Sequence, residues 1–341
     1  MISTCLLALL PAFFQATGPA KPSAQLSEAY DPMQLATGSE VQHLQLIAKR
    51  GEREIPLLVY LPVSEPEAKL KRLPVVLFSH GLGGSRQGCA YLGEHWAARG
   101  FAAVFMQHAG SDEAVWKELR PWKRMWALKR AANAENAALR CQDVSSTIDA
   151  LEGWNLEPEH ALLGRLDLEH LAMSGHSFGA VTTQMVCGQN AAASAAIFTD
   201  KRIDAALVLS PSPPKFGSAK AGLRDVFVPM LLITGSLDKA PIGGVTPEQR
   251  REVFDGLPNS HERFELMLDG ADHMAFTQSA FMGKKDHRNP KHHTAILSLS
   301  SAFLDAYLRE DVLAKNWLMG TGPRSVLETA DGWRLALAKQ Q

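Results

Sequence analysis

The sequence has no excess of charge of either sign. Its 341 residues carry 35 lysines and arginines against 36 aspartates and glutamates, which gives a formal net charge of −1. A protein that binds nucleic acid through general electrostatics carries a marked basic excess, so we expect no nucleic-acid partner. No apolar run approaches the ~20 residues that a membrane-spanning helix requires, so we expect no transmembrane span.

Cysteine is also scarce. The chain has four cysteines, and Cys5 belongs to an N-terminal apolar run. The other three, Cys89, Cys141 and Cys187, cannot all pair with one another, and none has the Cys-x-x-Cys or His-rich spacing of a metal site. We expect them to be small buried apolar side chains, and they do not decide the redox compartment.

The N-terminus has the pattern of an export signal. Residues 5–14 form an apolar run with the length of a signal-peptide core, and small residues follow it. Residues 1–4 carry no lysine or arginine, so a hydrophobic anchor or a misassigned start codon remains an alternative. We predict a signal peptide over 1–20, an extended arm over 21–40, and export to the periplasm or the extracellular space.

Strand-like and helix-like segments alternate through the rest of the chain. The run at 73–78 is continuously apolar, as in a strand buried on both faces of a parallel sheet. Further strands are predicted at 41–48, 55–61, 101–107, 170–174, 204–209, 228–234 and 264–268, and helices at 90–99, 132–152, 179–187 and 294–308. This alternation predicts an α/β fold, with a mostly parallel sheet and helices on both faces. The predicted domain covers 41–315, and 316–341 is a C-terminal extension.

The segment Gly175-His176-Ser177-Phe178-Gly179 has the pattern Gly-x-Ser-x-Gly between a strand-like and a helix-like stretch. A serine on a tight strand-to-helix turn adopts strained backbone angles and projects its hydroxyl above the sheet. The glycines fit because other side chains would collide in that turn, and the helix N-terminus favours developing negative charge. We predict Ser177 as a nucleophile; the alternative is an ordinary glycine-flanked turn.

A glycine-rich loop, Ser79-His80-Gly81-Leu82-Gly83-Gly84, directly follows the strand that ends at Phe78. Acyl transfer needs backbone N–H groups that face the oxyanion. In this kind of fold one comes from the residue after the nucleophile, Phe178, and the other from this loop, where we predict Leu82. A phosphate-binding loop is the alternative, but the Gly-Lys-Ser/Thr and Gly-x-Gly-x-x-Gly patterns are both missing.

The acid and the base are expected after the serine, in that order along the chain. Asp238 follows an apolar strand and a glycine turn, which places it at the carboxyl edge of the sheet. His273 lies in the loop after the strand at 264–268. We predict His273 as the general base and Asp238 as the carboxylate that orients it. One competing carboxylate begins its strand and another adjoins the histidine. The competitors are Asp200, Asp204, Asp269 and Asp272.

Together these segments resemble the platelet-activating-factor acetylhydrolase branch of the α/β-hydrolases and its dienelactone-hydrolase-like bacterial relatives. The resemblance spans roughly residues 40–310. It is carried by Leu73-Pro-Val-Val-Leu-Phe-Ser-His-Gly-Leu-Gly-Gly, by Ala98-Arg-Gly-Phe, by Arg140-Cys-Gln-Asp-Val with Ile148-Asp, and by Gly-His-Ser-Phe-Gly. It implies an α/β-hydrolase fold and a lipase-like serine hydrolase that needs no cofactor and no metal.

Carried over by position, the resemblance makes Ser177 the nucleophile, His273 the base, and Leu82 and Phe178 the oxyanion donors. The acid departs from the pattern. In the acetylhydrolases proper it follows the strand after the nucleophile helix, whereas here that strand ends Val208-Leu-Ser-Pro without a carboxylate. Asp238 stands one strand later, as in dienelactone and polyester hydrolases. The resemblance therefore implies ester hydrolysis without implying phospholipid specificity.

Residues 111–140 interrupt the alternation with Trp116, Trp122 and Trp126 among many basic side chains. We predict a small helical insertion that is either a lid over an acyl pocket or an element that contacts a lipid interface. The alternative is that the tryptophans pack on the core, and we expect this for at least one of them.

A second interruption, at 283–293, is a basic loop with three histidines. His287, His292 and His293 do not have the helical His-x-x-x-His spacing of a metal site, and lysine and arginine surround them. We therefore predict a solvated loop and no metal.

The sequence thus predicts a carboxylic ester hydrolase that acts on a small-molecule or lipid ester. Two alternatives stay open. The chain could be a catalytically silent binding protein that keeps the fold, since fold alone does not license function. It could also be an acyltransferase or an amidase that uses the same triad.

Overall fold

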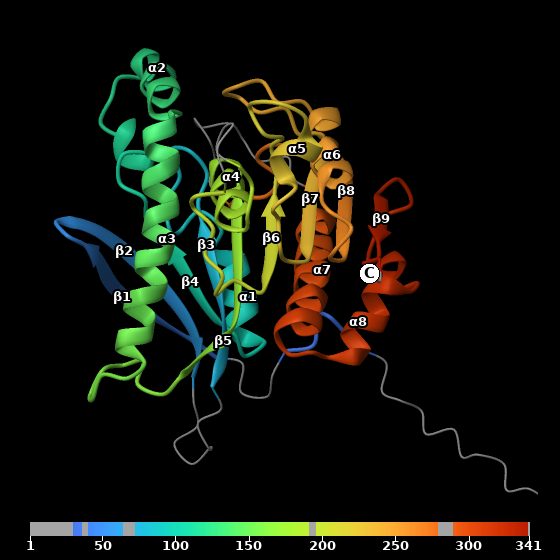
Figure 1. The fold of residues 1–341 in the computed structure, drawn as a ribbon, viewed down its shortest axis with the longest axis horizontal. Helices are drawn as coiled ribbons and strands as arrows, with labels where there is room; N and C mark the ends of the chain where they lie inside the picture. The colour runs from blue at the N-terminus through green and yellow to red at the C-terminus, as the bar shows by residue number, and fades with distance from the viewer. Residues whose placement is uncertain (1–29, 36–39, 64–71, 191–195, 279–288, 340–341) are drawn as a thin grey trace, which may run out of the picture.

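The structure is a computed structural model that describes residues 30–35, 40–63, 72–190, 196–278 and 289–339. The predicted signal peptide, most of the predicted arm and His287 lie outside the described residues. The described part of the chain forms a nine-stranded, mostly parallel sheet with helices on both faces, the α/β-hydrolase fold expected from the sequence (Figure 1). None of its helices combines the length and apolarity needed to cross a membrane.

The strand order across the sheet is β1-β2-β4-β3-β5-β6-β7-β8-β9. The strands are β1 (Val41–Arg50), β2 (Arg53–Pro62), β3 (Leu73–Ser79), β4 (Ala102–Met106), β5 (Leu166–His176), β6 (Ala205–Leu209), β7 (Met230–Leu237), β8 (Arg263–Asp272) and β9 (Gly332–Ala336). Strands β4, β3, β5, β6, β7 and β8 run parallel. Antiparallel pairs join β1 to β2, β2 to β4, and β8 to β9. The carboxyl ends of the parallel strands therefore meet at one edge of the sheet.

Helices cover the two faces of the sheet in separate groups. One face packs against α1 (Ala90–Ala98), α7 (Pro290–Leu308) and α8 (Val312–Met319). The other packs against α3 (Ala134–Trp154), α4 (Phe178–Val186), α5 (Ala219–Leu223) and α6 (Pro247–Gly256). In the described part of the chain the remaining elements are α2 (Pro121–Ala131) and the short 3₁₀ turns η1 (Glu113–Val115) and η3 (Gly322–Ser325).

Strand β3 shows why a buried parallel strand reads as continuously apolar. Val75 and Leu77 belong to the core under α3 and α4, whereas Val76 and Phe78 belong to the core under α1 and α7. All four side chains are buried. Because both faces of the sheet are covered, neither set of alternate positions can be polar.

Two segments that the sequence sets apart join this frame. The insertion at 111–140 forms η1, α2 and the first turns of α3, and α2 stands beyond the sheet above α3 (Figure 1). Residues 316–341 contribute β9, which extends the sheet by pairing with β8.

Candidate active site

Ser177 occupies the turn between β5 and α4. His176 is the last residue of β5 and Phe178 is the first residue of α4, so Ser177 alone forms the turn. The backbone angles of Ser177 are φ 56° and ψ −111°, a conformation that side-chain-bearing residues rarely adopt. Such strain is characteristic of a residue held in place for a function.

The two flanking glycines are required by close backbone approaches. A Cβ on Gly175 would lie 2.4 Å from the carbonyl oxygen of Gly179. A Cβ on Gly179 would lie 1.8 Å from the carbonyl oxygen of Ser79, at the end of β3. Neither position can hold a larger residue without moving the main chain, so the motif presses the serine turn against the end of β3.

The structure brings Ser177, His273 and Asp238 together in a hydrogen-bonded line. His273 Nε2 lies 2.9 Å from Ser177 Oγ, and His273 Nδ1 lies 2.7 Å from Asp238 Oδ1. The three residues follow the carboxyl ends of β5, β8 and β7, which meet at one sheet edge. With Nδ1–H donated to the carboxylate, Nε2 is free to accept the serine proton.

Asp238 is fully buried and its carboxylate is well supplied with donors. Ser210 Oγ and Thr234 Oγ1 donate to Oδ2 at 2.6 and 3.0 Å. Burial alone raises the pKa of Asp238, but the hydrogen bond and charge of His273, with Arg250 and Ser210, outweigh it and lower the pKa to about 2. The carboxylate is therefore ionised throughout the physiological pH range.

Arg250, from α6, is a member of the site that sequence reasoning missed. Its guanidinium lies 3.1 Å from Asp238 Oδ1 and donates to the carbonyls of Asp238, Ser210 and Pro211. It also lies 3.3 Å from His273 Nδ1. Because that nitrogen already donates its proton to Asp238, this last contact is a close approach of two donors.

His176 keeps a neutral ring beside the base. Its ring centroid lies 5.0 Å from that of His273, and its Nε2 lies 3.1 Å from the His273 carbonyl oxygen. Burial, together with the charge of His273, lowers the pKa of His176 to about 3. His176 therefore packs against His273 without adding charge to the site.

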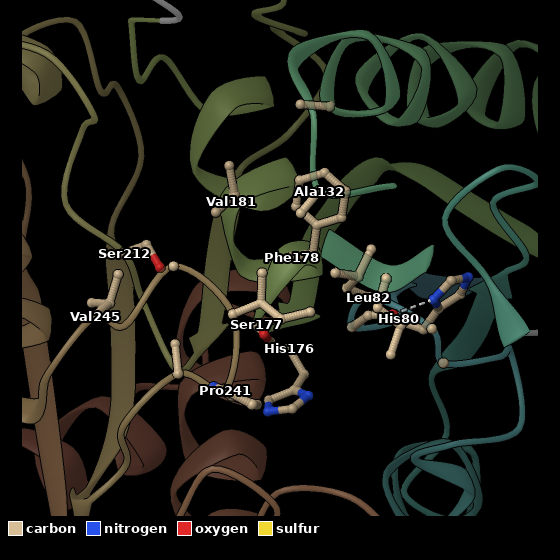
Figure 2. Close-up of a pocket in the computed structure, with 18 of the residues that line it drawn as sticks. His80, Leu82, Ala132, His176, Ser177, Phe178, Val181, Ser212, Pro241 and Val245 are labelled. Atoms are coloured by element: carbon tan, nitrogen blue, oxygen red, sulfur yellow. Dashed lines mark hydrogen bonds between the residues drawn. The ribbon is translucent and has the colours of Figure 1, made fainter. Parts of the chain in front are cut away.

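The loop after β3 runs alongside the nucleophile. A Cβ on Gly81 would lie 3.5 Å from Ser177 Cβ, which is van der Waals contact. Figure 2 shows Leu82 and Phe178 to one side of Ser177, and both line the same cavity as the serine. As the first residue of α4, Phe178 has one of the amide groups that a helix leaves without an internal partner.

A cavity of about 860 Å³ opens at Ser177. Its walls are largely apolar: α3 and α4 contribute Ala137, Val181 and Met185, and the insertion contributes Trp116 and Leu128. Across the cavity from Leu82, the segment after β7 closes the other side (Figure 2). A site of this size and character suits an apolar ligand of many atoms.

The three tryptophans of the insertion have different roles. Trp116 is partly buried and donates from Nε1 to the Gly83 carbonyl at 2.8 Å, so it packs against the loop after β3. Trp122 and Trp126 are 69% and 59% exposed. Trp116 therefore lies against this loop and lines the cavity, rather than packing on the core, and α2 presents the other two rings to the surroundings.

The remaining candidates lie elsewhere. The predicted solvated loop is wrong for His292 and His293, because both lie in the first turn of α7 and His292 is buried. Their rings contact the backbone carbonyls of Asp269 and Ala275. In the described ranges no group of three His, Cys, Asp or Glu side chains could hold a metal ion. The three cysteines after the N-terminal run are buried, as expected. Asp200 pairs with Arg202, and Asp204 accepts from the Leu171 amide, so neither competes with Asp238.

Comparison with known families gives one match, to the N-terminal part of the chain. A family model described as platelet-activating factor acetylhydrolase, isoform II, matches residues 42–121. The matched range runs from β1 through the loop after β3 to the start of α2, so it ends before Ser177. The match supports the resemblance to this family of α/β-hydrolases and supports a serine ester hydrolase in general. Curated proteins give no match to the chain.

Proposed function

We propose that this protein hydrolyses carboxylic esters through an acyl-enzyme on Ser177. The observation that carries the proposal is the line of hydrogen bonds from Asp238 through His273 to Ser177, which ends in an apolar cavity. Ser177 Oγ attacks the ester carbonyl while His273 Nε2 takes its proton. The collapsing intermediate expels the alcohol, which receives that proton from His273. Water then cleaves the acyl-enzyme by the same two steps.

The other residues stabilise charge during these steps. Asp238 holds the His273 tautomer and offsets the charge of the imidazolium that forms. The amides of Leu82 and Phe178 are the proposed donors to the oxyanion of each tetrahedral intermediate. Both residues line the cavity beside Ser177, and Phe178 begins α4, where a helix leaves its first amides without internal partners, which supports this assignment.

We propose short-chain or lipid-type acyl esters as substrates, with platelet-activating-factor-like phospholipids among them. The size and apolar walls of the cavity support an acyl chain that lies between α3, α4 and the insertion. Hydrolysis of p-nitrophenyl esters from acetate to palmitate gives the preferred chain length.

A fluorophosphonate probe distinguishes this proposal from a silent binding protein. The probe forms a covalent bond with an activated serine, so peptide mass spectrometry is expected to find it on Ser177. His273→Ala, which removes the base, is expected to lose most of the labelling. No labelling of folded wild-type protein would favour the silent protein. Products that partition with added alcohol, or turnover of an anilide, would instead indicate an acyltransferase or an amidase.

Contact with a lipid interface is a second part of the proposal, and α2 supports it. Trp122 and Trp126 lie one turn apart on its outer face, with exposed Lys123, Lys129 and Arg130 beside them. Tryptophan beside basic residues suits an anionic lipid surface. Binding to vesicles that contain phosphatidylserine should weaken in a Trp122→Ser, Trp126→Ser variant, while turnover of a soluble acetate ester stays the same.

Export is the third part, and only the apolar run at 5–14 supports it. Expression of the full chain in a bacterium with its own export pathway, followed by N-terminal sequencing of the periplasmic and secreted fractions, tests it. A mature chain that begins near residue 21 is expected. Uncleaved protein that stays in the cytosolic fraction would contradict export.

A further inference from the structure

A second Ser–His–Asp line lies behind the candidate site. His108 Nε2 lies 2.9 Å from Ser79 Oγ, and His108 Nδ1 lies 3.0 Å from Asp143 Oδ2. Its spacing nearly repeats that of the line at Ser177, but all three side chains are fully buried. Ser79 does not line the cavity, and its hydroxyl accepts a hydrogen bond from Arg140 at 2.8 Å. A substrate cannot reach this serine, so the line needs another explanation.

Arg140 connects this buried line to both sides of the candidate oxyanion site. On the side of the β3 loop it donates to Ser79 Oγ, to the His80 carbonyl and to Ser111 Oγ. On the side of α4 it donates to Thr182 Oγ1 at 3.0 Å, and its guanidinium lies 4.9 Å from the centre of the Phe178 ring. One rigid, planar group thus ties the end of β3 to the first turn of α4.

Burial of the Arg140 guanidinium costs free energy of folding. The side chain is fully buried, and burial lowers its pKa to about 9, which still leaves it charged at neutral pH. Among the residues that the structure describes, no carboxylate lies within 4 Å of its guanidinium. Asp143, one turn along α3, pairs instead with Arg53. Burying a cation among neutral oxygens costs free energy of folding, and an apolar side chain of similar size would join the same two elements without that cost.

His80 connects this group of residues to the peptide bond that carries the Leu82 amide. Its Nδ1 lies 2.7 Å from the Gly81 carbonyl oxygen, and its Nε2 accepts the His108 amide at 3.1 Å. The ring must therefore carry its proton on Nδ1 and donate it to that carbonyl. The Gly84 amide donates to the same oxygen at 3.0 Å. In a trans peptide the N–H points opposite to the C=O, so these two bonds turn the Leu82 N–H away from the loop interior.

We propose that Arg140, with His80, His108 and Asp143, forms a positioning network that holds the Leu82 and Phe178 amides in fixed relation to Ser177. This inference rests on the proposed function, because an oxyanion arises only if Ser177 attacks a carbonyl. Arg140, His108 and Asp143 do not line the cavity, and His80, which does, acts here through the Gly81 carbonyl. Arg140 fixes the distance between the two amides, and His80 fixes the direction of one of them.

Replacing the carbonyl oxygen of the substrate by sulfur tests the oxyanion site specifically. A general packing defect would lower the turnover of both esters and leave the ratio between them unchanged. A thiono ester presents sulfur to the oxyanion site, and sulfur is larger and accepts hydrogen bonds poorly. A rigid site discriminates strongly against it, whereas a loosened site discriminates less. The experiment measures kcat and KM for p-nitrophenyl butyrate and its thiono analogue with wild type, Arg140→Met, Arg140→Lys, Ser177→Ala and, as a control, Arg99→Met. Arg99 is a buried arginine on the other face of the sheet, paired with Asp305.

We expect Arg140→Met to lower kcat for the oxo ester about 10- to 100-fold, with KM within about 3-fold of wild type. The preference for the oxo over the thiono ester should fall by a similar factor. Arg140→Lys should recover part of both, because lysine keeps the charge and one donor. Arg99→Met should change neither kcat nor the oxo preference by more than about 2-fold.

The outcomes separate the two proposals. If Ser177→Ala keeps ester turnover, the proposed function fails and the network loses its purpose. If turnover depends on Ser177 but Arg140→Met keeps kcat and the oxo preference, the network alone is refuted. If Arg140→Met does not fold, two substitutions at His80 test the network instead. His80→Asn keeps a donor near the position of Nδ1 and should retain the preference for the oxo ester. His80→Leu removes the donor and should lose that preference. Equal behaviour of those two variants would overturn the proposal.

Discussion

At the scale of single residues, Arg250 places a buried positive charge beside the acid–base pair. Its guanidinium faces both Asp238 and His273, and the other ring close to His273, that of His176, is neutral. A cation at this position favours the ionised carboxylate, and Arg250 is one of the groups that hold the pKa of Asp238 low.

Removing the charge of Arg250 tests this account. In Arg250→Met the pKa of Asp238 should rise from about 2 toward its ordinary 3.8, because one of the charges that lower it is gone. The buried carboxylate also loses a partner, so the variant should unfold at a lower urea concentration at pH 7 and should lose about 10-fold or more in kcat on a soluble ester. Arg251→Met is the matched control, because the Arg251 side chain is half exposed and pairs with Glu265. An Arg250→Met variant with the stability and kcat of wild type would contradict the electrostatic role.

Two glycine substitutions should have opposite effects on stability. Gly179→Ala places a Cβ 1.8 Å from the Ser79 carbonyl oxygen, so it should destabilise the fold by at least about 3 kcal/mol. Gly153→Ala adds a methyl group to an exposed position of α3 with nothing within 4 Å, so it should stabilise by about 0.5–1 kcal/mol. Urea unfolding of both variants measures these changes. Equal effects would mean that the serine turn is not tightly packed against β3.

The sequence predicts the residues that carry a local signal and misses those that depend on packing. Ser177 lies in a recognisable motif, and His273 and Asp238 follow from chain order and strand ends. Arg250 carries no such signal, and Arg140 lies in a segment that carries the family resemblance without indicating a role for the arginine, because an arginine is normally exposed and only the folded chain reveals its burial.

At the scale of elements, the wall formed by α3 should limit the acyl chain. Ala137 faces the cavity, so Ala137→Phe is expected to fill part of it. The variant should lose about 10-fold or more in kcat/KM for octanoate and longer esters while acetate turnover changes little. Glu135→Phe, which puts the same ring on an exposed position outside the cavity wall, is the control. An unchanged chain-length profile in Ala137→Phe would place the acyl chain elsewhere.

Element prediction succeeded where one face or both faces of an element are uniformly apolar. Strand β3 and helix α7 are examples. The sequence pattern does not predict helix α6, because the helix is strongly polar. One of its buried positions is Arg250, which interrupts the row of apolar residues that marks the inward face of a helix. Its start did carry a readable signal, a Thr246–Gln249 capping box with proline at the first helical position. Strand β9 was missed because it is a short edge strand with no buried alternation.

At the scale of the whole molecule, buried neutral histidines should make the protein sensitive to acid. Burial lowers the pKa of His95 and His108 to about 4 and that of His176 to about 3, against an ordinary value of 6.5. Between pH 6.5 and 4 the unfolded chain therefore binds more protons than the folded one, so stability falls as the pH falls. These three groups alone give a slope approaching ~4 kcal/mol per pH unit. Burial also lowers the pKa of His80, which acts in the same direction.

The carboxylate of Asp238 acts in a lower window. Its folded pKa of about 2 lies below the ordinary 3.8, so its contribution is lost only as the pH falls from about 4 through 2. We therefore expect the free energy of unfolding in urea to drop steeply between pH 6 and 4.5. His95→Gln, which removes one titrating ring far from the cavity, should reduce that slope by about one proton. Equal stability at pH 7 and pH 5 would contradict the burial of neutral histidines.

The most direct test of the whole account is ester hydrolysis by wild type and Ser177→Ala, measured side by side on p-nitrophenyl butyrate and octanoate. Wild type should turn over, and Ser177→Ala should lose at least about 10⁴-fold in kcat while unfolding at the same urea concentration. Folded Ser177→Ala that keeps more than about one-hundredth of the wild-type rate would contradict a mechanism through an acyl-enzyme at this serine.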